Sequence, residues 1–207
     1  MAVLPMFPLG SVLLPGGVLT LHVFEPRYQA LVRACIESED HEFGTVLIER
    51  GSEVGGGDER RAMGTVARMV QVAELDGGRY AVVAVGTHRL IVRAWLPDDP
   101  YPLADVDEVP DEDHVPETVD ALVQELTPRV RRATALAMEL GDPVADPQMD
   151  LSDDLLIASY QLSSLAPLGD VDRFDLLVSA GPEARLRLLR DRLGDVETLL
   201  KFRLDAG

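Results

Sequence analysis

Lysine is nearly absent from this chain of 207 residues, and positive charge is scarce. Lys201 is the single lysine beside 18 arginines, and the many acidic residues leave a formal net charge of −17. Binding to nucleic acid depends on Lys and Arg releasing counterions from phosphates, so this balance argues against nucleic acid and against an anionic membrane. A nucleotide-binding P-loop needs the lysine of Gly-x-x-x-x-Gly-Lys-Ser/Thr, whereas Lys201 precedes Phe202 in a helical pattern. No P-loop ATPase is therefore expected.

Cysteine pairs and clustered histidines are missing as well. Cys35 is alone, which excludes an intramolecular disulfide, and its place on an apolar helical stripe predicts a small buried side chain. The histidines lack metal-ligand spacing such as His-x-x-x-His; they are His22, His41, His88 and His114. We predict no catalytic residue, no cofactor site and no metal site. A hydrolase using Ser11 or Ser52 with a histidine stays open, although no Gly-x-Ser-x-Gly elbow is present.

Long apolar runs are also absent. No run approaches the 18 residues that a membrane-spanning helix requires. The N-terminus has no basic region, and Pro5, Pro8 and Pro15 interrupt what resembles the core of a signal peptide. A cytoplasmic protein is expected.

The first half combines one helix with short strands. Residues 26–36 carry apolar side chains at helical spacing, and Pro26 suits the first helical position. The stripe consists of Tyr28, Leu31, Val32, Cys35 and Ile36. Strands are predicted at 43–49, 65–75, 79–85, 88–95 and 102–109, after two apolar runs that precede the helix, and 51–64 is expected to be a glycine-rich loop. Asp76-Gly77-Gly78 predicts a hairpin turn. Six or seven strands with one helix indicate an α+β domain with a curled, barrel-like sheet.

The second half is helical. Between residues 98 and 113 there are eight acidic residues and no basic ones, which indicates a domain boundary. Helices are predicted at 117–140, from 152, from 170 to about 181, and at 182–204, with a loop at 141–150. Pro128 predicts a kink, or a break with Thr127 as the cap. Ser152 is expected to cap a helix that has Asp153 and Asp154 in its first turn. These four helices predict a bundle.

Two N-terminal motifs indicate a family. The run LPxFPLxxVLxPG starts at Leu4, and LHxFEPRY follows from Leu21 to Tyr28. Together they resemble the substrate-binding N-terminal domain of the Lon proteases, particularly its stand-alone bacterial relatives. The identities are Pro5, Phe7, Pro8, Leu9, Pro15, Gly16, His22, Phe24, Glu25, Pro26, Arg27 and Tyr28. The helical half resembles the same domain less specifically.

The resemblance implies a PUA-like β-barrel followed by a helical bundle, here assigned to residues 1–114 and 115–207. It also implies a role in holding unfolded or damaged polypeptide and in self-association. A Lon peptidase relies on a serine–lysine pair, for which Lys201 in the terminal helix is unsuited. We therefore expect a non-enzymatic module that binds unfolded polypeptide, possible partners being a separate protease and a second copy in a homodimer.

The FEPRY motif has two interpretations. In the structural one, Glu25 caps the first helix and Arg27 pairs with a carboxylate of the barrel. In the functional one, the motif and three sheet residues edge a groove for an extended peptide. The candidate peptide-binding residues are Phe24, Glu25, Pro26, Arg27, Tyr28, Gly44, Thr65 and Arg89. Phe24 and Trp95 are expected in the core rather than as peptide anchors.

Three functions are thus compared. A polypeptide-binding module predicts an exposed apolar patch, bound by strand addition or in a hydrophobic groove. A hydrolase predicts converging polar side chains and a perturbed pKa in a pocket. RNA binding, which a PUA-like fold suggests, conflicts with the net charge of −17.

Overall fold

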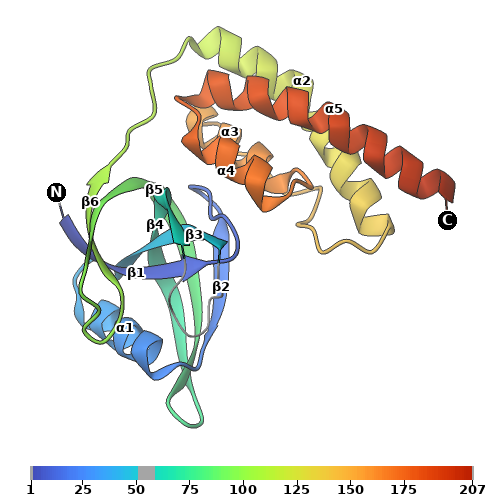
Figure 1. Ribbon diagram of the computed structural model, residues 1–207. Helices are drawn as coiled ribbons and strands as arrows, with labels where there is room; N and C mark the ends of the chain where they lie inside the picture. The colour runs from blue at the N-terminus through green and yellow to red at the C-terminus, as the bar shows by residue number, and fades with distance from the viewer. Residues whose placement is uncertain (1, 51–58, 207) are drawn as a thin grey trace. The chain divides into compact units, whose positions relative to one another are not determined.

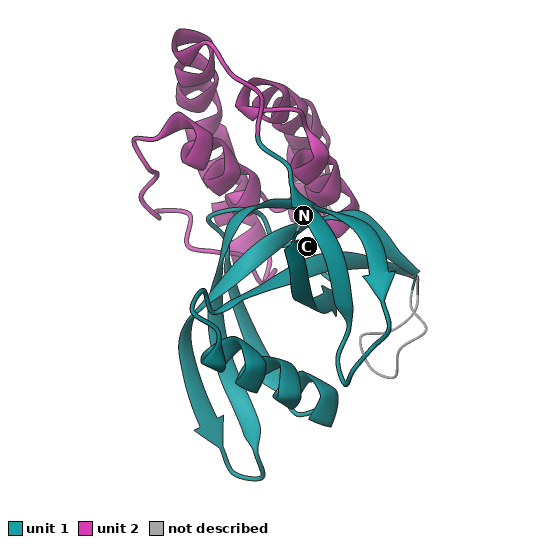
Figure 2. Ribbon diagram, turned by 90° about the vertical axis from the view of Figure 1, so that its left-hand side faces the viewer, with its two compact units in different colours: residues 1–110 teal, residues 111–207 magenta. Residues whose placement is uncertain are grey.

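The chain divides into two compact units, residues 1–110 and 111–207 (Figure 2). The computed structural model describes residues 2–50 and 59–206. Ser52 and most of the expected glycine-rich loop lie outside these ranges, and the end of that loop, from Glu59, belongs to a strand.

Unit 1 contains six strands and one helix in the part of the chain that the structure describes (Figure 1). They are β1 (Ala2–Leu9), β2 (Val18–Val23), α1 (Pro26–Glu37), β3 (Glu42–Arg50), β4 (Glu59–Leu75), β5 (Arg79–Leu96) and β6 (Leu103–Glu108). The strands form one sheet in the order β2-β5-β4-β3-β1-β6, and β5 also pairs with β6. This last pairing closes the sheet on itself, so the predicted curled barrel is confirmed.

β5 closes the barrel because it is long enough to serve two neighbours. Its first half pairs with β2 and its second half with β6, while β4 lies along its other edge. The two separate strands predicted around Gly86 are therefore one strand. Gly86 lets the loop before β2 approach: its N–H donates to the Gly17 carbonyl, and its own carbonyl accepts from the Gly16 N–H. A Cβ at Gly86 would lie 2.5 Å from the Leu14 carbonyl oxygen.

Two apolar clusters stabilise unit 1. One cluster lies between strands of the barrel and consists of Met6, Val46, Val66, Leu90, Ala104 and Val106. The other joins α1 to the sheet, with Tyr28, Leu31, Val32 and Cys35 as the buried residues of the helix. The amphipathic helix, its proline start and the buried Cys35 are thus confirmed. Each fully buried large side chain contributes roughly 1.5–3 kcal/mol.

Unit 2 is a bundle of four helices in its described residues. They are α2 (Pro116–Glu139), α3 (Leu155–Leu165), α4 (Asp170–Val178) and α5 (Pro182–Ala206). α2 and α5 run side by side (Figure 1), and their leucines and valines form the core with α3 and α4. None of the described helices is long and apolar enough to cross a membrane.

In unit 2 the predicted break at Pro128 and the predicted cap at Ser152 are wrong, whereas the alternative of a kink at Pro128 stays a prediction. α2 continues through Pro128 without a break, and the Thr127 hydroxyl donates to the Val123 carbonyl, 2.7 Å away, instead of capping a new helix. The N-cap of α3 is Asp154, whose carboxylate accepts from two backbone N–H groups of the first turn. Ser152 instead accepts from the Asp154 N–H. The carboxylate was a better cap than the serine that precedes it because it sits directly before the first turn.

Candidate functional site

The FEPRY motif forms the start of α1. The Glu25 side chain makes no capping hydrogen bond; instead it accepts one from Arg27 Nε at 3.1 Å. Glu25 is thus the N-cap residue of α1 but does not cap the helix through its side chain, and the pairing of Arg27 with a carboxylate of the barrel stays a prediction. Arg27 also lies over the ring of Tyr28, and Tyr28 stacks on Phe7 with 4.1 Å between ring centroids. Most of the motif thus fixes the helix to β1.

Phe24 is an exception within the motif, because 59% of its surface is exposed. Trp95 is exposed as well, and the guanidinium of Arg60 lies over its ring at 4.2 Å. The prediction that these two aromatic side chains belong to the core is wrong. Both side chains are exposed to solvent at the surface of unit 1.

The three sheet residues assigned to the peptide rim are buried. Met6 and Leu90 lie where a Cβ on Gly44 would be. Thr65 donates its hydroxyl hydrogen to the Leu13 carbonyl at 2.6 Å. Arg89 is 3% exposed and donates to the carbonyls of Val109 and Pro110. These three residues stabilise the interior of unit 1, so the predicted rim that joined them to FEPRY is wrong.

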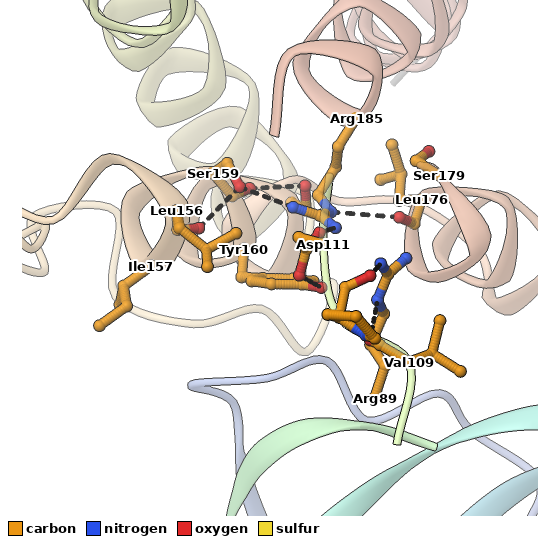
Figure 3. Close-up of polar contacts among 12 residues, drawn as sticks. Arg89, Val109, Asp111, Leu156, Ile157, Ser159, Tyr160, Leu176, Ser179 and Arg185 are labelled. Atoms are coloured by element: carbon orange, nitrogen blue, oxygen red, sulfur yellow. Dashed lines mark hydrogen bonds and ion pairs between the residues drawn. The ribbon is translucent and has the colours of Figure 1, made fainter. Parts of the chain in front are cut away.

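A cluster of buried polar contacts lies in unit 2 (Figure 3). Arg185 is fully buried, contacts Asp111 at 2.5 Å, and donates to Ser159 and to the Leu176 carbonyl. Its guanidinium lies over the Tyr160 ring, and the Tyr160 hydroxyl donates to Asp111. Ser159 donates to the Leu156 carbonyl, so a backbone oxygen rather than a base receives its hydrogen. The cluster is a buried ion pair that joins α3 and α5 to the start of unit 2.

A hollow of about 430 Å³ lies in unit 1 at the C-terminal end of α1. We call it the α1–β4 hollow; it is lined by Ile36, His41, Met69, Val70, Gln71, Val72, Glu74 and Tyr80. The lining is mostly apolar, and Ile36 and Val70 are exposed large hydrophobics. The hollow is at the opposite end of α1 from FEPRY, about 18 Å along a helix of 12 residues.

The residues that join α1 to β3 form one wall of the hollow and are held in place by hydrogen bonds. His41 adopts φ 55°, its N–H donates to the Ser38 hydroxyl, and its Nδ1 lies 2.9 Å from the Cys35 carbonyl. The Cys35 thiol contacts the Glu42 carbonyl below this turn, and burial raises the pKa of Cys35 to about 12. The wall is therefore preformed.

The opposite wall of the hollow is an edge of the sheet. β3 pairs with β4 only as far as Glu42 opposite Arg68, and the next contact is the Met69 N–H to the His41 carbonyl. β4 continues to Leu75 with β5 on its other side. Among the described residues no strand pairs with β4 on the β3 side beyond that point. We call residues 70–75 the free edge of β4.

Sequence reasoning predicted this hairpin but not its free edge. The strands at 65–75 and 79–85 and the turn between them are confirmed, with φ +78° at Gly77 and +71° at Gly78. The free edge arises because β3 begins at Glu42, which depends on a non-local register. An available signal was the pair of apolar residues at alternate positions, Val70 and Val72, next to the hairpin turn.

The described residues do not form the other candidate sites, a metal site or a serine–histidine pair. In the described ranges, no group of three His, Cys, Asp or Glu side chains is arranged to hold a metal ion. Ser11 follows β1, and no hydrogen bond of the described residues joins its hydroxyl to a histidine. The observed geometry instead offers an apolar hollow next to unpaired backbone, which suits the binding of an extended chain.

Comparison with known proteins assigns the family. The model of the ATP-dependent protease La (LON) substrate-binding domain matches residues 3–194. The Lon protease of Anaeromyxobacter dehalogenans is 30% identical over 207 residues, and Lon protease 2 of Myxococcus xanthus is 30% identical over 206. Each alignment covers 97% of this chain but 24% of the relative.

Solved structures agree with this assignment. A Lon N-terminal domain protein from Xanthomonas campestris superposes with a TM-score of 0.65 at 29% identity, covering 92% of this chain and 98% of that one. The N-terminal domain of the Mycobacterium avium complex Lon protease shares the fold, with a TM-score of 0.64 at 22% identity, and covers 94% and 99% of the two chains. The chain therefore belongs to the LON substrate-binding domain family.

Proposed function

We propose that this protein binds polypeptide, and that it recognises exposed apolar segments of unfolded or partly folded proteins at the α1–β4 hollow. The observation that carries the proposal is a preformed apolar hollow next to an unpaired strand edge. The family supports it, because its description is that of a substrate-binding domain. A folded globular protein has its apolar side chains and backbone groups already engaged, so it offers little to such a site.

The proposed activity is binding without catalysis. The matched family model describes substrate binding, and the chain spans 24% of the length of the Lon relatives. A separate protease that processes the bound client is the partner we propose. Self-association as a homodimer and a cytoplasmic location remain predictions of the same kind.

Binding to one polypeptide in two states tests the proposal. A fluorescently labelled, disulfide-containing protein is titrated with this chain in its native form and in its reduced, carboxymethylated form, and anisotropy is recorded without nucleotide. We expect the unfolded form to bind at least about tenfold more tightly, a difference of 1.4 kcal/mol. Equal affinity for the two forms would reject recognition of unfolded chain.

Two additional readouts complete this experiment. Gel electrophoresis of the same mixtures after a day should show an intact client, whereas fragments would return the hydrolase hypothesis. The variant Ile36→Ser removes apolar surface from the hollow, and Leu199→Ser removes a similarly exposed side chain from unit 2. We expect the first variant to weaken binding and the second to leave it unchanged.

A further inference from the structure

We propose that the bound polypeptide adds to unit 1 as an extra β-strand along the free edge of β4. This inference rests on the proposed function and specifies how the client is held. Its occupant is an extended segment with apolar residues at alternate positions and with Lys or Arg beside them. Four observations on the described residues support it.

The first is the length of unpaired backbone. The free edge covers six residues, 70–75, and a strand rises about 3.3 Å per residue, so about 20 Å of backbone is available. Its other side is already paired with β5, from Gln71 opposite Val83 to Leu75 opposite Arg79, which keeps the edge extended. An incoming chain therefore meets a formed template. The β4–β5 hairpin projects beside α1 in both views of the molecule (Figures 1 and 2).

The second is that residues 70–75 lack lysine and proline, so that Glu74 and the bulge at Val70 are the edge-strand protections present. Exposed edge strands commonly carry lysine or proline, which prevent pairing with another chain. Residues 70–75 read VQVAEL and contain neither. The register shift at Val70 marks a bulge where β4 leaves β3, and the ordinary pairing with β5 resumes at Gln71. The edge beyond the bulge thus keeps strand geometry.

The third is the position of the hollow relative to the edge. The side chains of a strand alternate between its two faces, so every second residue of an added strand would face α1. That side is lined by Ile36, Val72 and Tyr80. Alternate side chains of the client would therefore lie in the hollow, and we expect the site to prefer apolar residues at every second position, as in other cases of strand addition.

The fourth is the charge around the hollow. Glu37, Glu39 and Asp40 are exposed and lie between the lining residues Ile36 and His41. Glu74 lines the hollow itself. The nearby positive groups are Arg33, whose Nε donates to the Tyr80 hydroxyl at 3.2 Å, Arg68, which pairs with Glu42, and Arg79, opposite Leu75. The excess of acidic groups attracts Lys and Arg in the client and repels acidic segments.

Backbone N-methylation of a peptide tests strand pairing directly. The probe is a fluorescein-labelled decapeptide of alternating valine and lysine, with a set of analogues that each carry one N-methyl group. An added strand places only alternate N–H groups against its neighbour. We expect methylation at every second residue to weaken binding about fivefold or more, and methylation at the intervening residues to change it less than twofold.

The outcome separates this inference from the proposed function. If the peptide binds and all analogues behave alike, strand addition is rejected and recognition by side chains alone remains. If the valine–lysine peptide does not bind although unfolded protein does, the sequence preference is rejected. If neither binds, the proposed function itself fails.

Matched variants locate the strand. Val70 at the free edge of β4 is 60% exposed, and Val18 on β2, the edge strand at the other end of the sheet, is 69% exposed. We expect Val70→Lys to weaken binding at least about tenfold and Val18→Lys to leave it within twofold. Hydrogen exchange should show slower exchange at residues 70–75 when the peptide is bound. Slower exchange at β2 instead, with loss of binding in Val18→Lys, would overturn the assignment.

Discussion

The two units expose apolar side chains in different ways. In unit 1, Ile36 and Val70 lie next to backbone groups that no strand of the described chain pairs with. In unit 2, Leu199 and Phe202 are equally exposed, but they belong to α5, whose backbone hydrogen bonds are made within the helix. An extended chain can therefore gain both apolar contact and main-chain hydrogen bonds from unit 1, and only the former from unit 2.

The two units also differ in the partners of their buried polar side chains. Unit 1 buries Thr45, Thr65 and Arg89, whose side chains donate to backbone carbonyls. Unit 2 buries an ion pair between side chains, Arg185 with Asp111. Substitutions in the bundle are expected to have larger effects on stability, because loss of one member leaves an uncompensated charge in the interior.

Arg185→Met should give the largest effect. It removes the buried guanidinium that neutralises Asp111, and we expect a loss of about 3–5 kcal/mol in the free energy of unfolding. Urea unfolding followed by far-UV circular dichroism, which reports mainly on the helices, measures it. Arg187→Met is the control on the same helix, because Arg187 pairs with Glu183 at the surface and should cost less than about 1 kcal/mol.

A double variant sharpens this prediction. Asp111→Asn alone should also destabilise unit 2, because the buried guanidinium then loses the carboxylate that it contacts at 2.5 Å. Combined with Arg185→Met, the loss should be smaller than the sum of the two single losses, since the pair is already broken. Additive losses would mean that the two side chains stabilise the bundle independently.

Gly86→Ala should be the next largest and should act on unit 1. The added Cβ would lie 2.5 Å from the Leu14 carbonyl oxygen, and overpacking of this kind costs about 1–3 kcal/mol. Gly194→Ala is the matched change in unit 2: nothing lies within 4 Å of its Cβ, and alanine in a helix is favoured by about 1 kcal/mol. The substitution at Gly86 should therefore lower the free energy of unfolding, and the substitution at Gly194 should raise it.

The thiol of Cys35 measures the opening of unit 1. It is the single cysteine, it is buried, and its raised pKa of about 12 makes its thiolate rare below pH 9. The shift from 9.0 to about 12 alone slows alkylation at pH 8 by about a thousandfold, because the thiolate is the reacting form. Gly86→Ala should speed labelling relative to the parent protein, and Gly194→Ala should not.

Much of the fold was predictable because its signals are local. The stripe of α1, the Asp76-Gly77-Gly78 turn and the leucine spacing of α5 depend on residues within one or two turns of each other. The site was not predictable in the same way. The free edge of β4 depends on where β3 begins, at Glu42 opposite Arg68. The contact of Arg185 with Asp111 joins residues 74 positions apart in the chain.

The incorrect site residues have the same cause. Thr65 and Arg89 are polar residues within strands, and a sequence pattern does not show whether such a side chain faces a groove or a backbone carbonyl in the interior. Glu25 precedes a helix as a cap would, yet its carboxylate accepts from Arg27, two residues further along the chain. The sequence thus indicated that these polar side chains have hydrogen-bond partners, but it did not indicate which groups the partners are.

The smallest expected effect concerns a surface pair that joins α2 to α5. Arg129 donates to both carboxylate oxygens of Glu197, at 3.2 and 3.0 Å, and this hydrogen bonding lowers the pKa of Glu197. A lowered pKa in the folded state means that the pair stabilises above the pKa of the unfolded chain, near 4.5, and that the gain disappears as pH falls through the lower folded value. Because both side chains are about a quarter exposed, the gain should be at most about 1 kcal/mol.

Glu197→Gln should therefore be less stable than the parent protein at pH 7, and the difference should shrink as pH falls below the pKa of the unfolded chain, near 4.5. Unfolding by urea at pH 7, 5 and 3.5 measures the difference. Glu183→Gln, which removes an exposed pair within α5, should show a difference of a few tenths of a kcal/mol at most at any of these pH values. A difference for Glu197→Gln that was the same at pH 3.5 as at pH 7 would mean that the glutamate stabilises the bundle through packing of its side chain, and that the charges joining α2 and α5 contribute little.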